Sequence, residues 1–335
     1  MQEQLRIAVL EPGLDQAFDD LAEDARANRV ELVSPAKAGF DLGHCDGLIT
    51  GRRPLTGEEL RSAGPRLRHV QVLGRHFDHI DWKSAVDLGI TVGSHPRKGA
   101  WTVAEMALTF VMALSKQLLD GHEKVAAGAY RDLGLEPKLT SQRSHSFQWM
   151  KLPLRDVHGS TVGIIGMGEI GAELAVRLQP LGVRTLYYKR TPLSADAERA
   201  FGVSYAGFNE LLAASDFVVV AVPQTDETEG LIDAAALAAM SEDAYLINIC
   251  RGAVVDEGAL VKALRERRIR GAGLDVFVYE PLPADHPLTR LDNVLLAPHI
   301  GGGTGTKPPA ELWAGVEQAL VTLRQGVVRF PIPAA

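Results

Sequence analysis

A glycine-punctuated stretch near the middle of the chain, Ser160-Thr-Val-Gly-Ile-Ile-Gly-Met-Gly-Glu-Ile-Gly171, constrains the fold more than any other feature. An apolar run at residues 162–165 breaks into glycines at Gly166, Gly168 and Gly171 and then continues with helical periodicity. This order predicts a buried strand, a tight turn and a helix. The first glycine permits the turn, the second lets backbone approach a pyrophosphate, and the third lets the helix pack on the strand. A phosphate at that helix N-terminus would meet free N–H groups and the positive end of the helix dipole.

Short apolar segments recur on both sides of this stretch with helical segments between them, a pattern typical of parallel α/β sheets. Before it they lie at residues 7–10, 30–33, 47–50, 67–73 and 90–92; from it onward they lie at 162–165, 185–188, 217–222, 244–249, 273–277 and 294–297. The unbroken apolar run at 217–222 suits a strand covered on both faces. Six strands that begin with a glycine turn favour a doubly wound dinucleotide-binding fold over a glycine turn without a ligand.

A long amphipathic helix is expected between the two series of strands, because Val103, Met106, Phe110 and Leu114 share one helical face. Residues 131–150 follow it as a polar, irregular segment, which we interpret as a surface loop and a candidate lid or subunit arm. From residue 306 the pattern is helical to Gln325 and then extended. We therefore expect the C-terminus to return to the first domain.

Composition narrows the class of protein. The 335 residues carry a formal net charge of -7, which argues against a general nucleic-acid or membrane-surface binder. The N-terminus lacks the features of a signal peptide, and the longest apolar helical stretch is too short to span a bilayer. Cys45 and Cys250 have no C-x-x-C spacing, which fits a reducing compartment and offers no zinc site. These observations predict a cytoplasmic protein without a metal.

Four separated motifs carry a family resemblance. They are the glycine turn at 166–171, Asn248-Ile-Cys-Arg-Gly-Ala-Val-Val-Asp256, Gly273-Leu-Asp-Val-Phe277 with Tyr279-Glu-Pro281, and Ala297-Pro-His-Ile-Gly301. In this order and spacing the chain resembles the D-2-hydroxyacid dehydrogenases over nearly its whole length. The resemblance implies an α/β fold of two Rossmann-like domains. A doubly wound parallel-sheet cofactor domain, residues 101–304, would be inserted into a smaller flavodoxin-like substrate domain, residues 1–100 and 305–335.

The family transfers hydride between a nicotinamide and a 2-keto or D-2-hydroxy acid, and three residues of this chain suit that chemistry. The reaction needs a cation for the carboxylate and carbonyl and an acid for the developing alkoxide. Arg251 supplies a planar fork, His299 supplies the proton, and Glu280 can bond the imidazole and favour its protonated form. By resemblance these positions match the catalytic Arg, Glu and His. Taken singly, each residue also fits a structural alternative: a surface ion pair, a turn before Pro281, and a loop cap.

The residues after the second strand of the cofactor domain bear on the choice of dinucleotide. A carboxylate there would bind the ribose 2′-OH of NAD, but this chain has Tyr188-Lys-Arg-Thr191. Lys189 and Arg190, with Thr191, suit a 2′-phosphate. We therefore expect NADP(H) to be preferred, with NAD(H) possible; the alternative is a solvated Lys-Arg pair at a loop tip.

The resemblance also places other ligand contacts. Further dinucleotide contacts fall on Gly166, Met167, Gly168, Glu169, Ile170, Gly171, Val222, Pro223, Thr228, Ile249, Cys250, Asp275, Gly301 and Gly302. Substrate contacts fall on Leu73, Gly74, Arg75, His76, Arg251 and His299, with backbone N–H groups of the 73–81 loop on the substrate carboxylate. This loop usually carries a small residue where the chain has His76. The side chains of Arg75 and His76 are expected either to face solvent or to enter the cleft, where Arg97 and Lys98 would add positive charge.

The leading hypothesis is thus an NADP-preferring 2-keto acid reductase acting on glyoxylate, hydroxypyruvate or an aryl pyruvate. The expected partner is a small 2-keto or 2-hydroxy acid, with neither nucleic acid nor membrane, and family resemblance makes a homodimer the default. Two alternatives stay open: a phosphite- or formate-type dehydrogenase of the same fold, and a non-catalytic dinucleotide-sensing, corepressor-like protein.

Overall fold

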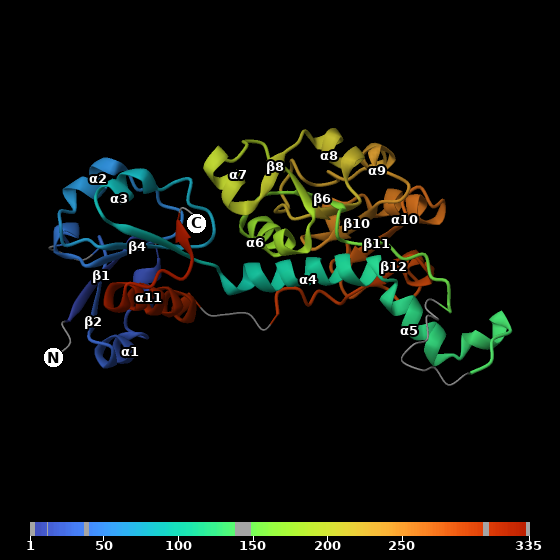
Figure 1. The fold of residues 1–335 in the computed structure, drawn as a ribbon, viewed down its shortest axis with the longest axis horizontal. Helices are drawn as coiled ribbons and strands as arrows, with labels where there is room; N and C mark the ends of the chain where they lie inside the picture. Colours follow the sequence, from blue (N-terminus) through green and yellow to red (C-terminus); the bar gives the residue numbers. More distant parts are fainter. Residues whose placement is uncertain (1–3, 12, 37–39, 138–148, 304–307, 333–335) are drawn as a thin grey trace, which may run out of the picture.

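The computed structural model describes residues 4–11, 13–36, 40–137, 149–303 and 308–332. They form two α/β units that lie side by side along the long axis of the molecule (Figure 1). Helix α4 (Lys98–Ser115) begins at the first unit and runs beneath the second. The expected long linking helix is therefore present.

The first sheet has the strand order β13-β5-β4-β3-β1-β2. Its strands are β1 (Leu5–Val9), β2 (Val30–Val33), β3 (Gly47–Thr50), β4 (His69–Leu73), β5 (Thr91–His95) and β13 (Pro331–Ile332). Helices α2 (Gly57–Ser62) and α3 (Trp82–Asp87) cover one face, and α1 (Ala22–Ala27) and α11 (Pro308–Gln325) lie on the other (Figure 1). Strand β13 pairs antiparallel with β5, so the described C-terminal segment does return to the first unit.

The second sheet is entirely parallel, with the order β12-β11-β10-β9-β6-β7-β8. Its strands are β6 (Thr161–Ile165), β7 (Arg184–Tyr188), β8 (Val203–Tyr205), β9 (Phe217–Val220), β10 (Tyr245–Asn248), β11 (Gly271–Leu274) and β12 (Val294–Leu296). The strand order reverses between β6 and β9, which is where ligands bind in doubly wound sheets. The predicted α/β class with two Rossmann-like domains is confirmed.

Two layers of helices cover this sheet. Helices α6 (Glu169–Leu178) and α7 (Ala195–Phe201) pack with α4 on one face. Helices α8 (Phe208–Ala214), α9 (Ala234–Ala239) and α10 (Glu257–Arg265) pack on the other. The apolar core under α4, α6 and α7 continues into the α2/α3 side of the first sheet, so one apolar cluster spans both units.

Two strands differ from the expectation. Strand β8 is an edge strand of three residues, two of them exposed, and so lacks an apolar pattern. Strand β11 lies at Gly271–Leu274 rather than 273–277, because the small residues needed there carry little apolar signal. A Cβ on Gly273 would lie 2.7 Å from the ring of Phe110 in α4, so the close approach of this helix requires a residue without a side chain.

Helix α4 is a core helix. It buries Ala104, Ala107, Phe110 and Val111. Within the described ranges no single helix is long and apolar enough to cross a membrane. Helices α4 and α5 (Leu118–Ala126), which meet at a bend of 56°, would together be long and apolar enough, judged by length and composition alone. The segment 131–150 begins inside a 3-10 turn, Ala129–Leu133, while its residues 138–148 lie outside the described ones.

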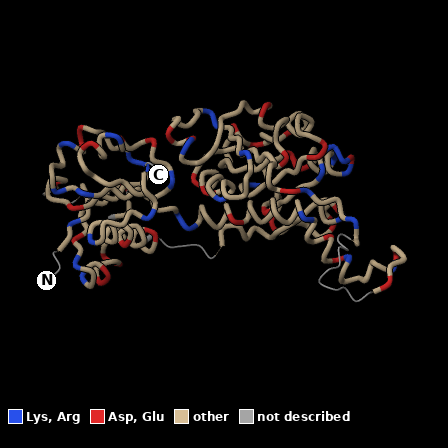
Figure 2. The backbone as a smooth tube through the Cα atoms, viewed as in Figure 1, with Lys and Arg blue, Asp and Glu red and all other residues tan. Residues whose placement is uncertain are grey.

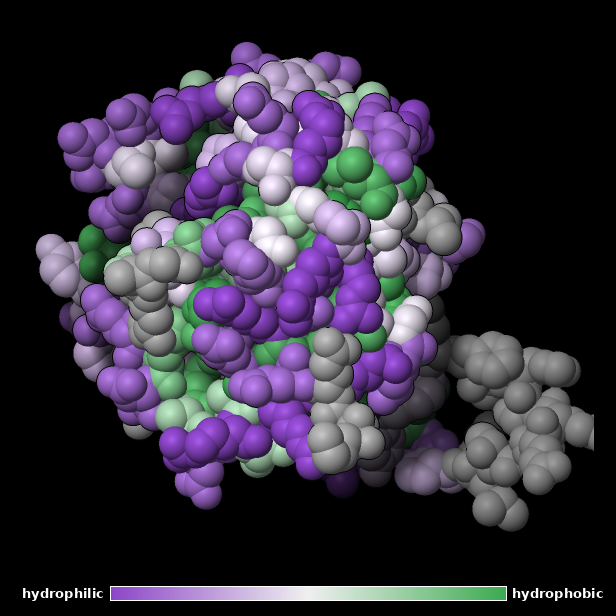
Figure 3. Space-filling view, turned by 90° about the vertical axis from the view of Figure 1, so that its left-hand side faces the viewer, coloured by the Kyte–Doolittle hydropathy of each residue, from purple (hydrophilic) through white to green (hydrophobic). Residues whose placement is uncertain are grey.

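Charged residues of both signs are interspersed along both units (Figure 2). The end of the molecule formed by the first unit is mostly hydrophilic, with small apolar areas between the polar side chains (Figure 3). The electrostatics of any site must therefore be judged from its own ion pairs rather than from net charge.

Candidate active site

The glycine turn has the geometry that its sequence predicts. Gly166 has φ +100°, and a Cβ on it would lie 2.5 Å from the carbonyl oxygen of Ala221 on the neighbouring chain segment. A Cβ on Gly171 would lie 2.5 Å from the carbonyl oxygen of Gly166, so helix α6 packs directly on the turn. A Cβ on Gly168, in contrast, would meet nothing within 4 Å. The turn thus leaves open backbone at the N-terminus of α6, as a pyrophosphate requires.

A cavity of about 590 Å³ extends from this turn. On the side of the second unit it is lined by the turn, by 188–191 and by the segment after β9. Ten of the predicted dinucleotide residues meet there: Gly166, Met167, Gly168, Glu169, Lys189, Arg190, Thr191, Val222, Pro223 and Thr228. Arg52, His76 and His79 of the first unit close the opposite side; the sequence did not single out Arg52, and His79 was placed only within the 73–81 loop, without a role of its own. Both follow the ends of first-sheet strands, Arg52 after β3 and His79 after β4.

The other predicted dinucleotide residues lie outside this cavity. Ile170 and Gly171 belong to α6, and Gly171 is buried. Ile249 and Cys250 are buried after β10, and burial raises the pKa of the Cys250 thiol to about 11. Gly301 and Gly302 follow the candidate histidine, where the backbone N–H groups of Ile300 and Gly301 donate to the two carboxylate oxygens of Asp275, at 2.9 and 2.8 Å. Asp275 therefore anchors the loop after β12, and its remaining lone pairs can still accept another donor.

The end of β7 presents cations to the cavity. Tyr187 is fully buried; its hydroxyl donates to Glu198 and accepts from the backbone N–H of Leu193, both at 2.8 Å. Burial raises the pKa of Tyr187 to about 12, so the phenol stays neutral and holds the turn into α7. Lys189, half-buried, and Arg190, exposed, follow it on the rim, so the chain has a lysine at the position after the strand where a carboxylate would bind a ribose 2′-OH.

The predicted pair Glu280–His299 forms. One carboxylate oxygen of Glu280 lies 2.7 Å from Nδ1 of His299, and the other accepts from the backbone N–H of Phe277 at 3.0 Å. Desolvation raises the pKa of Glu280, but the hydrogen bonds from His299 and Phe277 and the charges of His299 and Arg251 outweigh it, so the net shift is downward. Glu280 is thus held as a carboxylate that orients the imidazole.

Arg251 follows the carboxyl end of β10, and its charge is one of the smaller causes that lower the pKa of Glu280. Its guanidinium donates to the carbonyl of Cys250 at 2.6 Å and is otherwise exposed. Asn248, whose role the motif alone did not reveal, fixes the turn: its amide donates to the carbonyl of Arg251 and accepts from the N–H of Cys250, at 3.0 and 3.1 Å. A Cβ on Gly252 would overlap the backbone of Phe277, so this turn packs against the segment that carries Glu280.

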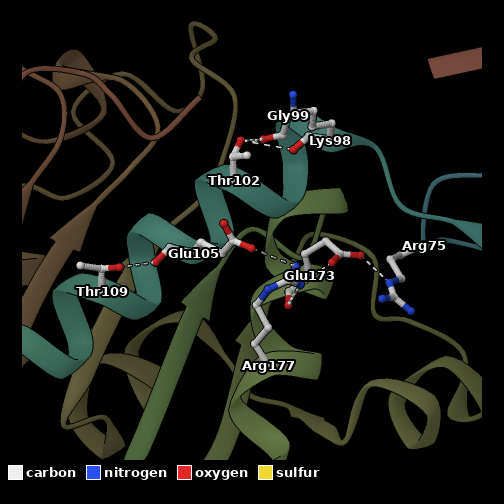
Figure 4. A network of polar contacts seen from close by, with 8 residues as sticks. All are labelled: Arg75, Lys98, Gly99, Thr102, Glu105, Thr109, Glu173 and Arg177. Atoms are coloured by element: carbon white, nitrogen blue, oxygen red, sulfur yellow. Dashed lines mark hydrogen bonds and ion pairs between the residues drawn. The ribbon is translucent and has the colours of Figure 1, made fainter. Parts of the chain in front are cut away.

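The loop after β4 faces the glycine turn. Leu73 is buried in β4, and Gly74 has φ +123°. The side chain of Arg75 neither faces solvent nor enters the cavity; it forms an ion pair with Glu173 of α6 (Figure 4). His76 does line the cavity, with its ring 5.7 Å from that of Phe201.

The expected positive charge at Arg97 is balanced. Its guanidinium lies 3.4 Å from the carboxylate of Glu11. Among the described residues no group of three or more His, Cys, Asp or Glu side chains converges as metal ligands do. The cavity is lined by glycine backbone, by the cations Arg52, Lys189 and Arg190, by the imidazoles of His76 and His79, and by the acids Glu169 and Glu227.

Comparison with known proteins identifies the family. A family model described as the NAD binding domain of D-isomer specific 2-hydroxyacid dehydrogenases matches residues 108–301. A glyoxylate reductase from Korarchaeum cryptofilum is 39% identical over 260 residues, covering 78% of this chain and 74% of the relative.

Solved structures are similar over nearly the whole chain. The TT0316 protein from Thermus thermophilus has a TM-score of 0.53 at 31% identity, covering 98% of this chain and 100% of the other. An NADPH-dependent glyoxylate/hydroxypyruvate reductase from Sinorhizobium meliloti, solved with NADP and malonate, has a TM-score of 0.52 at 28% identity, with coverages of 98% and 97%. The resemblance expected from the motifs is confirmed: the chain belongs to the D-isomer-specific 2-hydroxyacid dehydrogenases, which are oxidoreductases that use a nicotinamide dinucleotide.

Proposed function

We propose that this enzyme reduces a 2-keto acid such as glyoxylate, hydroxypyruvate or an aryl pyruvate, with NADP(H) as the preferred dinucleotide. Residues 101–304 hold the dinucleotide, and residues 1–100 and 305–335 bring the substrate loop to it. The observation that carries the proposal is the hydrogen-bonded pair Glu280–His299, within reach of the charge of Arg251, on the sheet that also bears the glycine turn.

The nicotinamide supplies the hydride when it is bound. Arg251 presents its guanidinium to the substrate's carboxylate and carbonyl oxygens and polarises the carbonyl. His299 donates the proton that the developing alkoxide takes, and Glu280 holds the imidazole through Nδ1 so that Nε2 faces the substrate. Asp275 keeps the loop of His299 in place and has a free lone pair for the nicotinamide carboxamide.

The dinucleotide preference rests on the rim of the cavity. Lys189 and Arg190 supply two positive charges where a ribose 2′-phosphate would lie, and the hydroxyl of Thr191 lines the same rim. Charge-assisted hydrogen bonds of this kind favour a phosphate over a hydroxyl.

The substrate carboxylate has a separate site in the loop after β4. Its two oxygens would accept from the backbone N–H groups of Arg75 and His76, which in this structure donate to the carboxylate of Glu169.

The arm around α5 suits a homodimer. Leu118, Leu119, Val125 and Trp149 are exposed there, and Leu118, Val125 and Trp149 also line an apolar cavity of about 460 Å³. Exposed apolar surface of this kind is typical of protein interfaces. Sedimentation velocity of the purified enzyme should show a dimer, and Val125→Asp should shift it toward the monomer.

The proposed reaction is tested by NADPH and NADH absorbance loss over a panel of glyoxylate, hydroxypyruvate and phenylpyruvate, with phosphite and formate assayed in the direction of NADP⁺ and NAD⁺ reduction. We expect turnover of at least one keto acid with NADPH above NADH. Arg251→Ala and His299→Ala should each retain NADPH binding and lose most turnover. Retained NADPH binding without turnover of any keto acid would refute the proposal in favour of a sensor, and turnover of phosphite or formate alone would favour the other dehydrogenase class.

A further inference from the structure

Glu169 reaches from the glycine turn to the other domain. It is the first residue of α6, and its carboxylate accepts the backbone N–H of Arg75 at 2.6 Å and, more weakly, that of His76 at 3.5 Å. The preceding Gly74 leaves room for this contact, since a Cβ there would lie 2.6 Å from a carboxylate oxygen of Glu169. Successive N–H groups after a residue with positive φ form an anion-binding concavity. In this structure a carboxylate of the chain itself fills it.

A second contact holds the same loop in register. Glu173 lies one turn after Glu169 on α6, so both side chains leave the same helical face. Its carboxylate pairs with the guanidinium of Arg75 and also with Arg177 (Figure 4). The side chain of Glu173 is 1% exposed and that of Arg75 is 14% exposed. Arg75 is therefore fixed to α6 through its guanidinium, independently of what its backbone N–H binds.

The position of Glu169 conflicts with both proposed ligands. Its carboxylate sits on the N–H pair proposed for the substrate carboxylate, and it lines the cavity at the helix N-terminus proposed for the pyrophosphate. The positive end of the helix dipole and the two N–H groups favour a negatively charged acceptor at this position. A substrate carboxylate has the same charge and the same acceptor geometry.

We propose that Glu169 is an internal surrogate for the substrate's carboxylate: it occupies the N–H groups of Arg75 and His76 in the free enzyme, and the substrate displaces it. The inference rests on the proposed function for the identity of the ligand. The pair Arg75–Glu173 keeps the loop docked on α6 during the exchange. Each binding event therefore breaks one charge-assisted contact before a new one forms, so Glu169 weakens the binding of every carboxylate ligand at this position.

The test compares Glu169→Gln and Glu169→Ala with the wild type and with Glu242→Gln, which removes an exposed carboxylate outside the cavity. The NADPH-loaded enzymes are titrated with oxalate by calorimetry, and the KM for glyoxylate is measured at saturating NADPH. We expect the Kd of oxalate and the KM of glyoxylate to fall about fivefold to tenfold in Glu169→Ala, as loss of one charge-assisted competitor implies. Glu169→Gln should give a smaller decrease, because its amide oxygen can still accept, and Glu242→Gln should match the wild type.

The two proposals fail in different ways. Unchanged or weaker oxalate binding in both Glu169 variants, or the same tightening in Glu242→Gln, would overturn the surrogate role whatever the turnover. Absence of keto acid turnover in the wild type would instead refute the proposed function. In that case the oxalate titration still decides the role of Glu169, because it measures carboxylate binding without chemistry, and failure of oxalate to bind any of the four proteins would overturn it.

Discussion

Removal of the two cations after β7 should abolish the preference for NADPH. Each of Lys189 and Arg190 is expected to make one charge-assisted contact to the 2′-phosphate, worth about 1.5–3 kcal/mol. Arg190 is exposed, and its charge is one of the minor influences that lower the pKa of Glu227, after the hydroxyl of Thr225. Both contacts are partly solvated, which places them at the low end of that range. At about 1.4 kcal/mol per factor of ten, Lys189→Ala and Arg190→Ala should each lower kcat/KM for NADPH roughly tenfold, and the double variant up to roughly a hundredfold.

The assay measures kcat/KM for NADPH and for NADH with the same keto acid at saturation. The variants should leave the value for NADH unchanged, since NADH has a hydroxyl at the same position. Lys189→Asp should raise it, because a carboxylate there can accept from both ribose hydroxyls. Lys262→Ala, which removes an exposed cation from α10, is the matched control. Equal losses with both dinucleotides, or no loss with NADPH, would refute the assignment of the 2′-phosphate to this rim.

Three further variants probe the site and the first sheet. Glu280→Gln keeps the size of the side chain but removes the charge beside His299, so turnover should fall about a hundredfold or more. The NADPH affinity, measured by fluorescence titration, should be retained. Near-normal turnover would contradict the role of Glu280. Gly252→Ala would force the backbone of Phe277 to move, and kcat should fall about tenfold or more. The control Gly258→Ala should keep its activity, because its Cβ would meet only the side chain of Asp256, at 3.4 Å. Burial lowers the pKa of His69 from 6.5 to about 4, so the unfolded chain binds a proton in this range that the folded chain excludes. The free energy of unfolding should therefore decrease by up to about 3 kcal/mol as the pH falls from 6.5 to 4, and urea unfolding of His69→Gln at pH 7 and pH 5 should show a smaller decrease than the wild type.

The parts of the fold that sequence predicts are those set by local pattern. The glycine turn, the apolar strands and the long helix each depend on residues within a short window, and all three are present. The predicted bounds of strand β11 were too far along the chain, because the strand contains Gly271 and Gly273. These glycines are required by neighbours from distant segments, the carbonyl of Asn293 and the ring of Phe110. A close approach of this kind leaves no apolar signal in the strand itself.

The contact between Glu280 and His299 was predictable for a different reason. Glu280 and His299 follow strands that are neighbours in a parallel sheet, so their meeting follows from topology once the family motifs place the strands. The ion pair of Arg75 was not predictable from the sequence. Its partner Glu173 stands four residues before Arg177 in a helix, a spacing that is typical of a solvent-exposed ion pair within that helix. The charge of Arg97 was overestimated for a similar reason, since Glu11 lies in a distant part of the sequence.

The exchange at Glu169 also requires a place for the displaced carboxylate. His79 lines the same cavity and lies in the field of Glu169, and its Nε2 is buried without a hydrogen-bond partner among the described residues, so a small shift of the ring would be needed to expose it to a carboxylate. Burial lowers the pKa of His79, although its hydrogen bond to Gly51 and the charge of Glu169 oppose this shift. An approaching carboxylate would oppose the effect of burial and favour the imidazolium form, since opposite charges at close range favour ionisation. Substrate binding in one domain would then change the partner of a residue on the phosphate turn of the other, so occupancy of the keto acid site and of the dinucleotide site would be coupled through a single side chain.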